Sequence, residues 1–225
     1  MTPLMRWLFF VHPIGQILKE VMKIFAVAYN YDAYNKAGES PLYMGKEPVV
    51  FMKADSALLK GGRPLFLPDE LGRIDYEAEL VVRICRLGKG IPERFAHRYY
   101  DAVTCGVDFT ARDLQQQLSA EGLPWDISKS FDGAAAVGEW VPCDGFPTDG
   151  IPFRLDVNHT TVQVGHSADM RWSIDALIAY ISRWFTLRTG DLIFTGTPSP
   201  TGPVHIDDHI TGYIGDKKVL EFNVK

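Results

Sequence analysis

The chain has 225 residues, of which 46% are hydrophobic and 23% are charged, as in an ordinary globular protein. This length suits one domain with a full hydrophobic core. The 23 Lys and Arg residues are scattered and are outnumbered by 28 Asp and Glu, so the net charge of −5 argues against a nucleic-acid partner. The three cysteines have no zinc-ligand spacing and indicate reduced thiols in a cytoplasmic protein.

Residues 1–21 are predicted to be an N-terminal extension without a role in the functional site, and residues 22–225 a single domain. The apolar run at 5–11 (MRWLFFV) is too short for a secretory signal and for a membrane span of about 20 residues. If the extension instead forms an amphipathic cap, its apolar side chains would be buried, namely Leu8, Ile17 and Leu18. No other segment approaches the length of a span, so no membrane partner is expected.

Apolar runs rich in Val, Ile and Phe recur between Gly and Pro residues and predict β-strands. They cover 23–28, 48–53, 78–85, 103–109, 152–157, 191–195 and 218–224. Helical patterns cover 91–99, 111–120 and 173–185, the last with Ser173 as its N-cap. More strands than helices, without alternation of the two, predict an α+β fold that is mainly β.

The pair Glu77 and Glu79 falls in a predicted strand, where residues two apart point to the same face. Two like charges side by side repel, and partial burial strengthens the repulsion. A hard divalent cation between them would relieve it. The alternative is the solvated face of an edge strand, but the apolar continuation at 80–84 favours a central strand.

Asp108 lies in an apolar run, where a surface charge is not expected, although it could instead cap the helix after Thr110. Three acidic oxygens with several waters suit Mg²⁺ or Mn²⁺. Lys129 is either an ordinary surface residue or, beside such a cluster, an anchor for an anionic substrate or a partner for a ligand carboxylate. The turn at 195–199 offers the Thr195 hydroxyl and neighbouring N–H groups to a carboxylate.

Five sequence blocks follow one another in a specific order: DYEAEL (75–80), GVDFTARDLQ (106–115), GLPW (122–125), KSFDG (129–133) and GDLIFTGTP (190–198). With these blocks the chain, from about Lys23 to its end, resembles the fumarylacetoacetate hydrolase family. The resemblance implies that family's mixed β-sandwich roll, usually a homodimer, with 22–225 as its catalytic domain.

The resemblance also implies roles for single residues. Glu77, Glu79 and Asp108 match ligands of Mg²⁺ or Mn²⁺, with Ca²⁺ as a substitute, and Lys129 matches an active-site lysine. The positions that match the lining of the substrate pocket, or offer it a hydroxyl, are Lys53, Gln115, Thr195 and Thr197.

The implied substrate is a small 2-oxo acid, such as an acylpyruvate, fumarylpyruvate or oxaloacetate. The acid would chelate the metal through a carboxylate oxygen and its keto oxygen, and the cation would stabilise the enolate that forms when a neighbouring C–C bond breaks. The predicted function is therefore metal-dependent C–C cleavage, by hydrolysis or decarboxylation. An isomerase or hydratase of an unsaturated 2-oxo acid shares the enolate and is the alternative.

One segment departs from the family pattern, in which Asn-Tyr-x-x-His and a Glu three residues beyond the His activate water. Here Tyr34 stands at the His position and Ala37 at the Glu position. Tyrosine, with a pKa of about 10, is a poor general base at neutral pH, and Glu39 is the candidate substitute. The departure affects hydrolysis more than decarboxylation, and a catalytically silent binder of metal and ligand is a further alternative. The last alternative is a purely structural set of carboxylates that holds no metal.

Overall fold

The computed structural model describes residues 22–32, 45–59, 61–143 and 150–225. The predicted extension at 1–21 lies outside these residues. The described helices are α2 (Glu93–Ala96), α3 (Arg112–Ala120) and α4 (Ile174–Trp184). The strands are β1 (Ile24–Ala28), β2 (Val49–Lys53), β3 (Leu58–Leu59), β4 (Ile74–Tyr76), β5 (Ala78–Ile84), β6 (Tyr100–Asp108), β7 (Thr110–Ala111), β8 (Ala135–Val137), β9 (Val141–Pro142), β10 (Pro152–Val157), β11 (Thr160–His166), β12 (Leu192–Phe194), β13 (Gly202–Pro203), β14 (His209–Ile214) and β15 (Lys217–Asn223).

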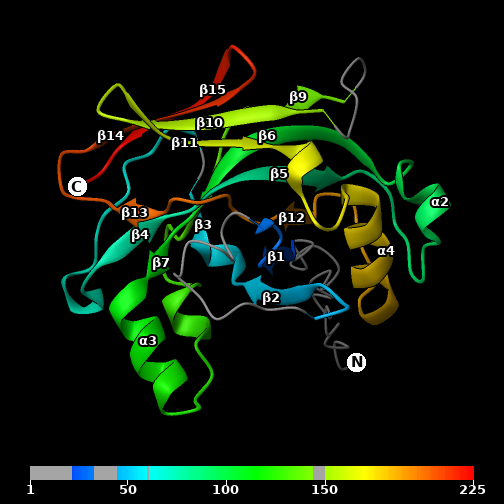
Figure 1. The fold of residues 1–225 in the computed structure, drawn as a ribbon, viewed down its shortest axis with the longest axis horizontal. Helices are drawn as coiled ribbons and strands as arrows, with labels where there is room; N and C mark the ends of the chain where they lie inside the picture. Colours follow the sequence, from blue (N-terminus) through cyan, green and yellow to red (C-terminus); the bar gives the residue numbers. More distant parts are fainter. Residues whose placement is uncertain (1–21, 33–44, 60, 144–149) are drawn as a thin grey trace, which may run out of the picture.

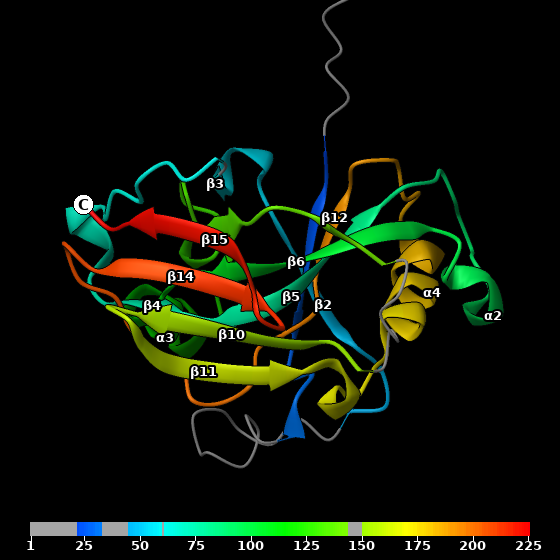
Figure 2. The same ribbon diagram turned by 90° about the horizontal axis from the view of Figure 1, so that it is seen from above.

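Two curled sheets form the body of the protein, which confirms the predicted α+β, mainly β fold (Figure 1). The larger sheet has the order β2-β1-β12-β5-β6-β8-β3, with β9 beside β6. It is mixed, because β1 runs parallel to β12 while β5 runs antiparallel to both β12 and β6. The second sheet, β11-β10-β14-β15, packs across β5 and β6 (Figure 2). A small third sheet, β13-β4-β7, lies at one end.

The main core fills the space between the two large sheets. Phe109, just after β6, meets Phe222 of β15 edge-on, with ring centroids 6.1 Å apart. Gly212 allows β14 to approach β6 closely, because a Cβ atom there would lie 2.9 Å from the sulfur of the fully buried Cys105. The close approach brings the two layers into direct contact at the centre of the molecule.

The seven predicted strands are all present, and β5 lies in the middle of the larger sheet, as its apolar continuation indicates. Ser173 caps α4 by accepting a hydrogen bond from the backbone N–H of Ala176. The helix predicted at 91–99 is only the four-residue α2, because the Tyr99 carbonyl pairs with the Cys85 N–H and β6 begins at the next residue.

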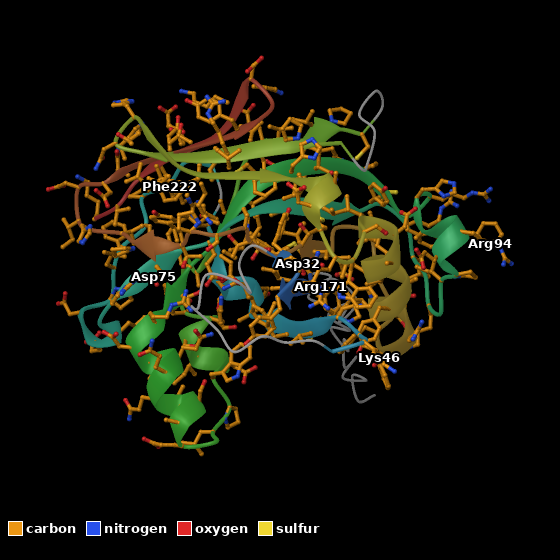
Figure 3. All side chains as sticks on the ribbon, viewed as in Figure 1. Asp32, Lys46, Asp75, Arg94, Arg171 and Phe222 are labelled. Atoms are coloured by element: carbon orange, nitrogen blue, oxygen red, sulfur yellow. The ribbon has the colours of Figure 1, made fainter. Side chains whose placement is uncertain are left out.

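Helices α3 and α4 lie at opposite ends of the larger sheet (Figure 1). Figure 3 labels Asp75 of β4 near α3, and Arg94 of α2 at the far end of the molecule beside α4. None of the described helices is long and apolar enough to cross a membrane. The site described next lies at the α3 end.

Candidate active site

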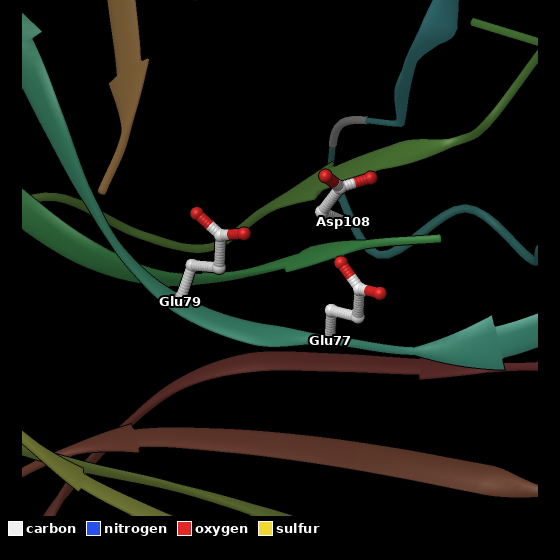
Figure 4. A group of neighbouring side chains, drawn as sticks. All are labelled: Glu77, Glu79 and Asp108. Atoms are coloured by element: carbon white, nitrogen blue, oxygen red, sulfur yellow. The ribbon is translucent and has the colours of Figure 1, made fainter. Parts of the chain in front are cut away.

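Three buried carboxylates meet where β5 and β6 run side by side. Glu77 immediately precedes β5, Glu79 is its second residue, and Asp108 ends β6. The backbone N–H of Asp108 donates to the Glu77 carbonyl at 2.8 Å, which holds the two strand ends together. Figure 4 shows Glu77 and Glu79 on one face of their strand, with Asp108 close by. One oxygen of each carboxylate lies within 4.8 Å of the others, and we call this set the acidic triad.

Asp108 does not cap a helix. The N-cap position of α3 is Ala111, and no side chain accepts a hydrogen bond there. Asp108 is instead fully buried, and its two oxygens lie 2.6 Å from the amine of Lys53 and 3.1 Å from that of Lys129.

Lys129 reaches the acidic triad from the short helical turn Asp126–Ser128. Its amine donates to Glu77 at 2.8 Å, to Asp108 at 3.1 Å and to the hydroxyl of Thr110 at 2.6 Å. Burial alone would lower the pKa of Lys129, but the negative charges of Asp108 and Glu77 outweigh burial and raise it. Lys129 is therefore a buried ammonium group and not a surface residue.

Lys53 lies behind Asp108. Its side chain is buried, pairs with Asp108 and donates to the carbonyl oxygen of Lys129. Burial lowers the pKa of Lys53. The structure thus places Lys53 against the acidic triad but not among the residues that line the adjoining cavity.

Glu77 and Glu79 have different electrostatic surroundings. Burial alone would raise the pKa of Glu77, but ion pairs with Lys129 and Arg112 lower it to about 2. For Glu79, burial and then the charge of Asp108 raise the pKa well above its usual range. Within the described part of the chain, Glu79 forms no ion pair and accepts from the backbone N–H of Gly196 at 2.6 Å.

This arrangement fits a divalent cation. All three side chains of the acidic triad offer hard oxygen ligands, which Mg²⁺ and Mn²⁺ prefer. Burial and the nearby charge of Asp108 raise the pKa of Glu79, and the positive charge of Lys129 opposes them only in part. A metal held by Glu77, Glu79 and Asp108 would supply the missing positive charge.

Arg112, at the start of α3, was not singled out in the sequence. Its guanidinium donates to Glu77 at 2.7 Å, to Asp75 at 2.9 Å and to the side-chain oxygen of Gln115 at 2.9 Å. It thereby orients one carboxylate of the acidic triad and one predicted pocket residue. The available signal was its place in the block 106–115, four residues after Asp108.

The turn after β12 is held by hydrogen bonds to both large sheets. Thr195 donates its hydroxyl to the Leu80 carbonyl, and Thr197 donates to the Ala78 carbonyl, both at 2.8 Å. Gln163 of β11 was also missed in the sequence; it accepts from the Ala78 N–H at 2.8 Å and donates to the Thr197 hydroxyl at 3.0 Å. Gln163 therefore fixes the backbone between the two glutamates from the opposite sheet.

A cavity of about 400 Å³ opens from the acidic triad. The predicted site residues that line it are Glu77, Glu79, Asp108, Gln115, Lys129 and Thr197. Thr195 does not line it, because its hydroxyl is turned to the Leu80 carbonyl. Tyr34, Ala37 and Glu39 lie outside the described residues.

Comparisons with known proteins agree with this geometry. The sequence model described as fumarylacetoacetate (FAA) hydrolase C-terminal matches residues 23–225. The chain is 34% identical to oxaloacetate tautomerase FAHD1, mitochondrial, of Mus musculus, over 95% of this chain and 96% of that protein. It is also 34% identical to oxaloacetate tautomerase YcgM of Escherichia coli, over 85% and 87% of the two chains.

Among solved structures, the fold is similar to that of fumarylpyruvate hydrolase from Pseudomonas aeruginosa in complex with Mn²⁺ and pyruvate. The TM-score is 0.83 and the identity 31%, over 91% of this chain and 89% of that one. The five ordered blocks, the β-sandwich and the matched model agree, and the chain belongs to the fumarylacetoacetate hydrolase family.

Proposed function

We propose that this protein is a Mg²⁺- or Mn²⁺-dependent enzyme that interconverts the keto and enol forms of a small 2-oxo acid. The observation that carries the proposal is the buried acidic triad paired with a protonated Lys129, all of which line one cavity. The names of two relatives as oxaloacetate tautomerases, and the Mn²⁺ and pyruvate in a structural relative, support the substrate class.

When bound, the cation would supply Lewis-acid polarisation of the keto group, which acidifies the neighbouring carbon. Lys129 keeps its proton because its pKa is raised, so it contributes a fixed positive charge beside oxygens that become negative. Arg112 and Gln115, joined by a hydrogen bond, position donors along the same wall. Thr197 is locked by Ala78 and Gln163 and bounds the site on the other side.

The test is the rate of oxaloacetate keto–enol exchange, followed by the ultraviolet absorbance of the enol, with and without Mn²⁺. We expect metal-dependent acceleration that falls by about 10²-fold or more in Lys129→Met, because a preorganised charge is lost. Metal binding without metal-dependent turnover of any 2-oxo acid would contradict the proposal and favour the silent binder.

C–C cleavage of an acylpyruvate, or decarboxylation of oxaloacetate, is the second candidate. It is favoured by the likeness to a fumarylpyruvate hydrolase at 31% identity. Because Tyr34 and Ala37 replace the family's His and Glu, hydrolysis is expected to be slow in the natural chain. The double change Tyr34→His with Ala37→Glu should raise acylpyruvate hydrolysis, and unchanged hydrolysis would mean that these positions do not limit it.

A further inference from the structure

The cavity has two walls that both start at the acidic triad. On α3, Arg112 bonds to Glu77, and the next cavity-lining residues, Gln115, Gln116 and Ser119, follow on one helix face. A helix rises 1.5 Å per residue, so Ser119 lies about 10 Å along the axis from Arg112. The α3 wall therefore leads away from the triad.

The β2 wall leads away in the same manner. Lys53 contacts Asp108, and Phe51 and Val49 follow at steps of two on the same strand face, each about 6.6 Å further along. Phe51 marks the border between the triad end of the cavity and its outer part, since its ring centroid lies 5.3 Å from the Lys129 amine. Trp125 also lines the cavity and packs edge-on against Phe51, with ring centroids 5.2 Å apart.

The two parts of the cavity differ in charge. The charged lining residues all lie at the triad end, where Lys129 and Arg112 are already paired with carboxylates. Beyond Phe51, the described lining residues are apolar or neutral. The volume of about 400 Å³ is within the range of pockets that hold drug-sized ligands, so a four-carbon acid at the triad leaves the outer part unfilled.

We infer that Val49, Phe51, Trp125 and Ser119 form a tail subsite that acts on 2-oxo acids longer than four carbons, and that it selects those whose far end is uncharged and apolar over those that end in a second carboxylate. A carboxylate there would lose its hydration without gaining a cationic partner from the described lining. A branched alkyl or phenyl group would instead bury its surface against the two rings. This inference rests on the proposed function and adds the class of substrate tail.

The experiment compares ligands that share a head and differ in the tail. Dissociation constants are measured by titration calorimetry on the Mn²⁺-loaded protein for four acids: pyruvate, 2-oxoglutarate, 5-methyl-2-oxohexanoate and 2-oxo-4-phenylbutanoate. 5-Methyl-2-oxohexanoate has the shape of 2-oxoglutarate, with an uncharged isopropyl group in place of the second carboxylate. We expect both uncharged tails to bind at least about tenfold more tightly than pyruvate, and 2-oxoglutarate to bind no more tightly than pyruvate.

Variants test whether the preference for uncharged tails comes from the tail subsite. Trp125→Ala is expected to reduce the preference for 2-oxo-4-phenylbutanoate over pyruvate about tenfold, whereas the matched control Trp184→Ala, at an exposed side chain outside the cavity, should keep the preference. Ser119→Arg adds a cation to the outer wall at an exposed position, so folding is retained, and it should reverse the preference toward 2-oxoglutarate.

The possible failures are distinct. Tighter binding of 2-oxoglutarate than of 5-methyl-2-oxohexanoate, or equal effects of Trp125→Ala and Trp184→Ala, would overturn the tail subsite and leave the proposed function standing. Absence of binding by all four acids, pyruvate included, would overturn the proposed function and the tail subsite with it.

Discussion

Glu77 and Glu79 are two residues apart on one strand face, and their neighbours shift their pKa values in opposite directions. Glu77 is held between Lys129 and Arg112, which keeps its pKa at about 2. The pKa of Glu79 is raised by burial and by Asp108. The metal-free site is therefore expected to bind a proton on Glu79.

Metal binding should release that proton, because the ligand form of a carboxyl group is deprotonated. We expect metal affinity to rise with pH, and the heat of Mn²⁺ binding to depend on the ionisation enthalpy of the buffer. Titration calorimetry in two buffers measures this directly. Glu79→Gln should bind Mn²⁺ at least about tenfold more weakly and release no proton; proton release by this variant would assign the proton to another group.

Glu79 also sets a pH dependence of stability. A carboxyl whose pKa is higher in the folded than in the unfolded state binds more protons when folded, so the metal-free protein should lose stability as pH rises above 4.5. The slope is up to about 1.4 kcal/mol per pH unit until the raised pKa is passed. Thermal unfolding without metal should show that Glu79→Gln loses less stability with rising pH than the natural protein. An identical pH dependence in the two proteins would contradict the assignment of this effect to Glu79.

Between the sheets, Gln163 is a buried polar connection to the site. It lies 85 positions from Ala78 in the sequence and 34 from Thr197, and its side chain is buried. Because Ala78 separates the two glutamates, the second sheet helps to position both candidate metal ligands on the first.

Replacing Gln163 with leucine should lower the free energy of unfolding by about 3 kcal/mol, since the Ala78 N–H would be buried without an acceptor. The affinity for Mn²⁺ should fall as well. Chemical denaturation measures the first effect and calorimetry the second. On α3, Gln117→Leu is the matched control, because that side chain is exposed and pairs with Glu121 just after the helix, and its expected cost is below about 0.5 kcal/mol. Equal losses in both variants would contradict a special role for Gln163.

The sequence predicted those elements whose signal is local. Strand β5 is rich in apolar residues (AELVVRI), and Glu77, Glu79, Asp108 and Lys129 stand in short recognisable blocks. Strands β11 and β14 interrupt their apolar residues with Thr, Gln and Gly, so no run marks them. The contacts of Gln163 join residues that are far apart in the sequence, and no local sequence pattern predicts such long-range contacts.

For the whole molecule, the prediction that residues 1–21 stand apart from the functional domain is tested by truncation. A chain that begins at Met22 should keep its melting temperature within a few degrees, because it retains every described strand and helix, and it should bind Mn²⁺ with unchanged affinity. Thermal unfolding and calorimetry provide the measurements. A large loss of stability would instead favour the amphipathic cap with buried Leu8, Ile17 and Leu18.

The homodimer stays a prediction, based on the family. Sedimentation equilibrium of the full chain should give about twice the mass of the 25.2 kDa chain. A mass of one chain at micromolar concentration would contradict the homodimer.

The parallel pairing of β1 with β12 has a consequence for biosynthesis. Ile24 lies opposite Leu192, so nearly the whole chain must leave the ribosome before the centre of the larger sheet can close. Until then β1 can pair only with β2, and its apolar segment IFAVA keeps one edge open to other chains. Nascent chains that stall before residue 192 therefore lack the partner for this edge of β1, and chaperone contact with β1 is expected in them.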